Sequence, residues 1–411
     1  KTGSAYDWTA GTIEFTPSWL PYSTAGGGVA NFGQDSSFAG NATAQGNQDG
    51  NSIGDFYYEP PTDYLALCTS NIPDPEIKLP GDNFNTILYS GNSGARSLTG
   101  VGFQPDLTWI KSRTSTDSHQ LFDVVRGVLQ HLESNDTGAE ATLAGSLTAF
   151  DSDGFSLGSV SQVNDSSNTF VAWNWLGANG TVSNTTGSVD STVSANTTAG
   201  FSIVGYTGDD ESSATVGHGL SVAPDLIILK RRNGAAQWPV GTLNDPMNWT
   251  DYMALDKANN YGDYPYWNDT APTATVFSIG ADDDVNKSDG TYIAYCFHSV
   301  EGFSRIGQYT SNNNANGAFV YTGFSPAFLI IKNMDSGSTA WVMVDDKRNT
   351  YNQFGEYMSA EGTQADTTDT ILDMLSNGFK FRDNDLNWNN TTDRYLYYAI
   401  AKNPFKFANA R

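Results

Sequence analysis

One strand-like segment occurs three times in the sequence, and this repetition constrains the fold more than any other feature. Each copy begins at a proline and reaches a lysine six residues later through a nearly continuous apolar run: "PDLTWIK" from Pro105, "PDLIILK" from Pro224 and "PAFLIIK" from Pro326. A tyrosine lies 16 to 18 residues before each proline and a phenylalanine 50 to 53 residues after it. These landmark residues are Tyr89, Tyr206 and Tyr309, and Phe155, Phe277 and Phe379. Their constant order predicts three copies of one structural unit.

The strand patterns and the composition indicate an all-β chain. Each unit closes on a segment with alternating aromatic or apolar residues, "TFVAWNWLG", "TYIAYCFHS" or "RYLYYAIAK", as in a half-buried strand. The proline-led segments are apolar on both faces, as in central strands covered on each side. The 41 glycines and the low charged fraction of 16% are typical of short strands joined by turns. We therefore predict an all-β fold of tandem β-sandwich or jelly-roll repeats in an elongated chain, where each copy lengthens a rod.

The landmarks divide the chain into a leading segment and three repeats. The predicted β-sandwich repeats span 84–178, 201–302 and 303–411. Gly, Ser, Thr and Asn dominate residues 179–200, which predicts a linker between the first two repeats. Residues 1–83 lack the repeat pattern, and we predict that they contain the last strands of a separate β domain followed by an extended connector. Because the chain starts at Lys1 rather than Met, we expect a processed or partial piece of a longer protein.

The charge excludes two classes of partner. A formal net charge of −24 opposes binding to nucleic acid and to anionic membranes. No apolar run of 18 residues occurs, so we expect no membrane insertion. Only 21 residues are Lys or Arg, which fits an extracellular or seawater-like milieu. Cys68 and Cys296 lie in unlike contexts, and we interpret them as free thiols rather than a disulfide.

Several motifs together resemble a known family. They are "GFQPDLTWIK", "HQLFDVVRG", "FDSDGFSLG", "FVAWNW", "GHGLSVAPDLIILK", "YIAYCFHSVEG", "VYTGFSPAFLIIK" and "NPFKFANAR". Their combination resembles the C-terminal repeat region, of unknown function, of tail-fibre-like virion proteins from marine tailed bacteriophages. The segment "NFGQDSSFAGNATAQGNQDGNSIGDFYYEPPTDYLALC" resembles the end of a concanavalin-like, SPRY-type domain. The resemblance implies that residues 1–83 are the C-terminal part of a lectin-like β domain plus a connector, and that the protein lies on the virion surface, outside the cell.

No residue pattern indicates a catalytic centre, a metal site or a cofactor. The four histidines are scattered over the repeats without an accompanying nucleophile or carboxylate motif, and we predict structural roles for all of them: His119, His131, His218 and His298. Asp151 and Asp153 precede Gly154 as in a calcium loop, but Gln162 stands where a bidentate glutamate would be needed. We therefore expect no enzymatic activity, no metal and no cofactor.

The segment "NNYGDYPYWNDTAP", residues 259–272, is the best candidate for ligand contact. It gathers four aromatic residues among Gly, Asp, Asn and Pro: Tyr261, Tyr264, Tyr266 and Trp267. Aromatic rings stack on sugar faces while amides and carboxylates bind the hydroxyls, so we predict an exposed carbohydrate-binding loop. The alternative is that these rings pack under the loop or against a neighbouring chain.

These observations lead to one hypothesis about function and two alternatives. The hypothesis is a structural subunit of a bacteriophage virion appendage, such as a tail fibre, that binds a host-surface glycan. Its expected partners are other virion proteins and copies of itself, with a trimer favoured. The first alternative is a glycan-degrading depolymerase, which needs two carboxylates about 5 to 9 Å apart in a cleft. The second is a purely structural capsid or tail decoration protein without a ligand.

Overall fold

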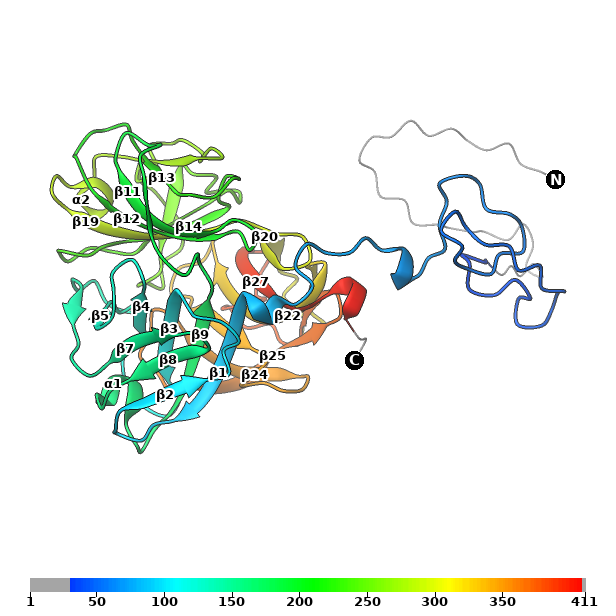
Figure 1. Cartoon of the computed structure of the whole chain (residues 1–411), viewed down its shortest axis with the longest axis horizontal. Helices are drawn as coiled ribbons and strands as arrows, with labels where there is room; N and C mark the ends of the chain where they lie inside the picture. The colour runs from blue at the N-terminus through cyan, green and yellow to red at the C-terminus, as the bar shows by residue number, and fades with distance from the viewer. Residues whose placement is uncertain (1–29, 409–411) are drawn as a thin grey trace. The chain divides into compact units, whose positions relative to one another are not determined.

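The computed structural model describes residues 30–408, which fall into two compact units with their boundary between Pro73 and Asp74 (Figure 1). In the first unit, the described residues form turns, an isolated β-bridge between Asn47 and Phe56, and the 3₁₀ helix η1 (Thr69–Asn71). The predicted strands nearest the start of the chain fall in residues 1–29, outside the described part. All three repeats belong to the second unit.

The second unit consists of β-strands joined by turns, with a few very short helices. Repeat 1 contains η2 (Pro80–Asp82), β1 (Phe84–Ser90), β2 (Arg96–Thr99), β3 (Leu107–Ser112), β4 (Gln120–Asp123), β5 (Gln130–His131), β6 (Ala141–Thr142), β7 (Leu147–Asp151), β8 (Gly154–Leu157), α1 (Ser161–Asn164) and β9 (Thr169–Trp175). Repeat 2 contains β10 (Val182–Asn184), β11 (Ser191–Asn196), β12 (Phe201–Thr207), β13 (Ala214–Gly217), β14 (Leu226–Arg231), β15 (Pro239–Thr242), β16 (Asp251–Ala254), β17 (Gly262–Asp263), β18 (Val276–Ile279), α2 (Asp283–Asn286) and β19 (Thr291–Phe297). Repeat 3 contains β20 (Ser304–Thr310), β21 (Phe319–Tyr321), β22 (Phe324–Asn333), β23 (Trp341–Asp345), β24 (Phe354–Ser359), β25 (Thr367–Leu375), β26 (Gly378–Phe381), β27 (Arg394–Pro404) and η3 (Phe405–Phe407). None of the helices in residues 30–408 is long and apolar enough to cross a membrane.

The three repeats share one antiparallel strand order. The main sheets run β1-β9-β3-β4 in repeat 1, β12-β19-β14-β15 within repeat 2 and β20-β27-β22-β23 within repeat 3. Facing strands follow the orders β2-β8-β7, β13-β18 and β21-β26-β25. In repeat 3, β24 joins both layers into one eight-stranded sheet. The all-β, sandwich-type fold predicted from the sequence is confirmed.

The landmark tyrosines fix the pairing of β1 with β9, of β12 with β19 and of β20 with β27. Each lies opposite an aromatic residue and stacks on it with ring centroids 5.1, 4.9 and 5.1 Å apart, in the pairs Tyr89–Phe170, Tyr206–Tyr292 and Tyr309–Tyr395. Each tyrosine hydroxyl also donates a hydrogen bond to a backbone carbonyl, at Val163, Val285 and Trp388 respectively. A buried ring with a satisfied hydroxyl sets the strand register, because a shift by one residue would place the ring on the opposite face.

The proline-led strands are apolar on both faces because each lies between two cores. In β3, Ile110 packs into the core of repeat 1, whereas Trp109 faces a central core shared by all three repeats. The same alternation places Leu229 of β14 in the core of repeat 2 and Ile228 in the central core. Residues from all three repeats also line an apolar cavity of about 10 Å³ in this central core. The central core is therefore closely packed.

Contacts between the repeats run in one direction around the central core. Equivalent residues at the start of β4, β15 and β23 each reach a backbone carbonyl of the neighbouring repeat: His119 Nε2 meets Ser359 O, Trp238 Nε1 donates to Glu133 O, and Trp341 Nε1 donates to Ala254 O. Repeat 1 thus contacts repeat 3, repeat 2 contacts repeat 1, and repeat 3 contacts repeat 2. The repeats form a closed ring (Figure 1) rather than the rod that the sequence pattern predicts.

The segment 179–200 is not the linker that its composition predicts. It contains β10 and β11, which extend the main sheet of repeat 2 beside β12. Val193 is 2% exposed and packs into the core of repeat 2, and Ser191 donates a buried hydrogen bond to Gly217 O. The correction has a physical reason: the β-branched residues Thr192 and Val193 favour a strand, and β11 pairs with the edge of the sheet at β12.

The buried imidazole of His119 should make stability dependent on pH. Its Nδ1 accepts a hydrogen bond from Trp109 Nε1 at 2.8 Å, and burial lowers the pKa of His119 to about 3. The unfolded chain binds this proton more tightly, so the free energy of unfolding should fall as the pH decreases from about 6.5 toward 3, by up to about 1.4 kcal/mol per pH unit. In urea titrations, a His119→Gln variant should lose less stability than the unchanged protein between about pH 7 and pH 4.5. A stability difference that is constant over this interval would contradict the prediction.

Candidate functional site

The predicted carbohydrate-binding loop does not present its aromatic rings together at the surface. Trp267 and Tyr266 are 1% and 3% exposed, and the indole of Trp267 packs edge-on against Trp249 in the core of repeat 2. The indole also lies against the backbone of Gly241, where any side chain would collide with it. Tyr264, at 41%, is the most exposed of the four rings. The prediction of an exposed carbohydrate-binding loop is therefore wrong for Tyr266 and Trp267, because both side chains pack into the core of repeat 2.

The hydroxyl groups of Tyr264 and Tyr266 bind carboxylates at the start of the adjoining helix α2. The Tyr264 hydroxyl donates to Asp282 at 2.7 Å, and the Tyr266 hydroxyl donates to Asp284 at 2.8 Å. The hydrogen bond to Asp282 raises the pKa of Tyr264, whereas burial is the main cause that raises the pKa of Tyr266. Both hydroxyls are therefore engaged within the protein and hold the loop against the first turn of α2.

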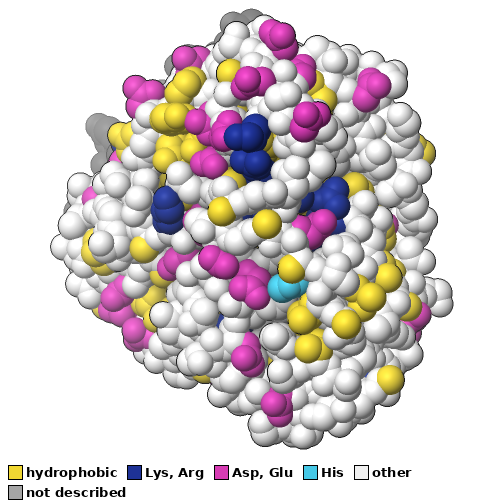
Figure 2. All heavy atoms as spheres, turned by 90° about the vertical axis from the view of Figure 1, so that its left-hand side faces the viewer, with side chains coloured by type: hydrophobic (Ala, Val, Ile, Leu, Met, Phe, Trp, Pro, Cys, Tyr) yellow, Lys and Arg dark blue, Asp and Glu magenta, His cyan; other side chains and the backbone are white. Residues whose placement is uncertain are grey.

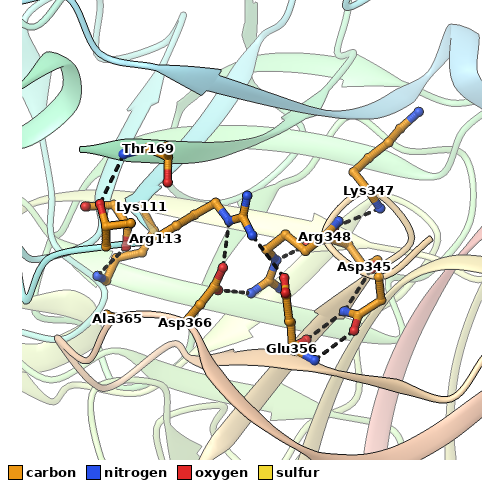
Figure 3. A network of polar contacts seen from close by, with 12 residues as sticks. Lys111, Arg113, Thr169, Asp345, Lys347, Arg348, Glu356, Ala365 and Asp366 are labelled. Carbon is orange, nitrogen blue, oxygen red and sulfur yellow. Dashed lines mark hydrogen bonds and ion pairs between the residues drawn. The ribbon is translucent and has the colours of Figure 1, made fainter. Parts of the chain in front are cut away.

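A network of ion pairs connects repeat 3 to repeat 1, with its fully buried part inside repeat 3 and a partly buried part across the interface (Figure 3). Arg348 is completely buried, and its guanidinium binds Asp345 at 2.6 Å and Asp366 at 2.8 Å. Arg113 of repeat 1 binds the other oxygen of Asp366 at 2.6 Å and also reaches Glu356. Asp366 thus lies between two guanidinium groups from different repeats, which makes this carboxylate the electrostatic link of the interface.

The interface between repeats 1 and 2 has the same arrangement. Buried Arg126 pairs with Asp123 and contacts Glu140, which in turn receives two hydrogen bonds from Arg232 of repeat 2. At the interface between repeats 2 and 3, Tyr261 occupies the position that Glu140 and Asp366 occupy at the other two interfaces. The backbone N–H of Tyr261 donates to Met334 O. The backbone N–H groups of Glu140 and Asp366 donate in the same way to Arg232 O and Arg113 O. The structure therefore assigns Tyr261 to the interface between repeats 2 and 3.

The lysines of the three repeated strands and Asp153 bind backbone groups. The three landmark lysines are fully buried, and each ammonium group donates to carbonyl oxygens: Lys111 to Ser112 and Ser115, Lys230 to Thr137 and Ala236, and Lys332 to Thr339. Burial lowers the pKa of each lysine to about 8. Asp153 of the calcium-like turn accepts from the N–H groups of Gly100 and Gly102. In residues 30–408, no group of three or more His, Cys, Asp and Glu is placed to hold a metal ion.

A pocket of about 390 Å³ opens at one end of repeat 3, and its walls come from four separate segments. These are the start of β22, the loop between β23 and β24, the turn between β25 and β26, and the end of β27. Pairing of Phe324 with Pro404 and of Ser325 with Asn403 extends β22 and β27 to 10 and 11 residues, against 6 and 7 in β14 and β19. This extension forms one wall of a pocket whose volume suits a small ligand.

The residues of this pocket combine an exposed ring, an ion pair and free polar groups. Tyr351 is 79% exposed, and Lys402 binds Asp346 at 2.7 Å. The sequence interpretation missed these residues because they are ordinary types spread over four segments. The sequence signal at this position is Ala327, which follows Pro326 where Asp106 and Asp225 follow the prolines of the other two copies.

The surface elsewhere is strongly acidic. Figure 2 shows one face, where separate carboxylates are spread widely and the fewer Lys and Arg side chains gather near the middle. This distribution agrees with the net charge of −24 and favours neutral or cationic ligands over anionic ones.

Comparison with known protein families gives one match, which covers the three repeats together. No curated protein and no solved structure matches the chain. A family model described as a domain of unknown function, DUF7483, matches residues 79–404, which begins just before β1 and ends with β27. The matched region spans all three repeats, so the ring as a whole is the unit that the family model describes. The chain therefore belongs to the family of the domain of unknown function DUF7483.

Proposed function

We propose that this chain is a structural subunit of a bacteriophage virion appendage, such as a tail fibre, exposed on the virion surface and in contact with a host-surface glycan. The observation that carries the proposal is an open pocket in repeat 3 that is lined by polar side chains without a hydrogen-bond partner in the described residues, namely Ser325, Thr350, Ser376 and Asn403. Arg348 and Asp366, in contrast, are used to join repeats 1 and 3. A rigid ring with a recognition pocket suits an attachment subunit, and the resemblance to tail-fibre-like proteins supports the same role.

Labelling of virions tests the location. Antibodies raised against the purified chain should bind the appendages of phage particles that encode it, as seen by immunogold electron microscopy. Particles with unlabelled appendages, in a preparation whose protein content includes the chain, would contradict the proposal. Release of reducing ends from host polysaccharide by the purified chain would instead favour the depolymerase alternative.

Self-association is a separate expected result. Appendage subunits act in symmetric assemblies, and repeat 3 exposes several aromatic side chains, namely Phe319, Tyr321, Phe405 and Phe407. The purified chain should therefore sediment as an oligomer, with a mass of about three chains favoured. A stable monomer at concentrations of about 100 μM would contradict self-association while leaving the location on the virion to the labelling experiment.

A further inference from the structure

Four polar side chains of the pocket in repeat 3 have unused hydrogen-bond donors and acceptors. Ser325 and Asn403 lie opposite each other on β22 and β27, and Thr350 and Ser376 line the same pocket. None of these four side chains has a hydrogen-bond partner within residues 30–408. Hydroxyl and amide groups both donate and accept hydrogen bonds. They therefore match a ligand whose own groups also do both, as sugar hydroxyls do.

The charges of the pocket are balanced in pairs. Lys402 neutralises Asp346, and Arg382 binds one oxygen of Asp373. The field of the whole protein, with a net charge of −24, opposes an anionic ligand. An uncharged ligand leaves both ion pairs intact, and the net negative charge of the protein does not oppose its binding.

Asp373 adds an acceptor that lacks a donor. The residue is 7% exposed and lines the pocket, and its Oδ1 is buried without a hydrogen-bond partner in the described part of the chain. An ionised carboxylate oxygen can only accept. A buried acceptor of this kind is stabilised by a hydroxyl donor, and a small rotation of the Asp373 side chain toward the pocket would let a sugar hydroxyl supply it.

The rest of the lining is apolar or aromatic. Pro326, Phe354 and Met374 contribute to the pocket, and the ring of Tyr351 is 79% exposed beside them. Aromatic faces pack against the C–H face of a sugar ring. We infer that this pocket binds one neutral sugar residue, with hydroxyls directed at Asp373, Asn403 and the serine and threonine side chains and with a ring face on Tyr351. The inference rests on the proposed contact with a glycan and names its site and ligand class.

Saturation-transfer NMR on the purified full chain tests this inference directly. The probes are galactose, glucose, mannose and N-acetylglucosamine at about 1–50 mM, with glucuronate and glucosamine as charged counterparts. At least one neutral sugar should bind with a millimolar Kd. Tyr351→Ala should weaken this binding about fivefold, and Asp373→Asn about tenfold. Tyr64→Ala, which truncates an exposed tyrosine outside the pocket, should leave the Kd unchanged.

Three results would overturn the inference: absence of binding for all four neutral sugars, tighter binding of glucosamine or glucuronate than of every neutral sugar, or equal Kd values for the Tyr351→Ala and unchanged proteins. If Asp373→Asn disturbs folding, as circular dichroism would show, the surface variants Tyr351→Ala and Asn403→Ala decide the matter. The virion labelling experiment does not use the pocket. A sugar-binding failure with labelled appendages therefore rejects only this inference, and sugar binding with unlabelled appendages rejects only the location.

Discussion

Replacing Arg348 with methionine should lower the free energy of unfolding by about 3–5 kcal/mol, because it leaves a buried carboxylate without its cation. Both side chains of the Arg348–Asp345 pair are completely buried. The guanidinium also donates to Met343 O at 3.0 Å and lies 5.4 Å from the ring centre of Trp173 in repeat 1. Urea denaturation followed by tryptophan fluorescence would measure the loss.

Two further variants separate the charge effect from general disturbance. Lys347→Met removes a positive charge from the exposed neighbouring position and should change the unfolding free energy by less than about 0.5 kcal/mol. Combining Arg348→Met with Asp345→Asn removes the uncompensated charge and should be less destabilising than Arg348→Met alone. If the single and double variants lose equal stability, the loss comes from packing rather than from the unpaired carboxylate.

Replacing Trp267 with alanine should also destabilise the protein by about 3–5 kcal/mol, because it empties a large, fully buried site. The indole packs against Trp249 and the backbone of Gly241, and the glycine leaves room for it. Tyr264→Ala, in the same loop at 41% exposure, is the matched control and should cost about 1 kcal/mol, through the lost hydrogen bond to Asp282. Thermal unfolding of the two variants would measure the contrast. Similar small losses for both would show that Trp267 is a surface residue after all.

The repeated strands could be predicted because their landmarks act locally. Pro105, Pro224 and Pro326 precede strands with the same apolar pattern, and the landmark tyrosines pair with the closing strands of their own repeats. Periodicity reports which residues are buried, but it does not say which element covers each face. The run "PDLTWIK" therefore predicts a strand covered on both sides without indicating that one cover is the central core.

The closed ring and the pocket depend on contacts between distant segments. Arg113 and Asp366 are 253 residues apart and have no sequence pattern in common. Trp267 illustrates a second limit: an aromatic residue among Gly, Asp and Asn has the composition of an exposed loop, and tertiary packing decides whether it is buried. Tyr351 and Asn403 come together only because β27 continues beyond its counterparts.

The closed ring fixes how the family can change during evolution. A linear array can gain or lose one repeat by duplication or deletion, since each unit contacts only its neighbours and the ends are capped. Here each repeat contributes side chains to one central core, so deleting a repeat would expose apolar side chains of the other two, and a fourth repeat could not be added without widening the core. The number of repeats is therefore fixed at three. Inherited variation is confined to outward loops and to strand ends such as those of β22 and β27, where repeat 3 differs from repeats 1 and 2.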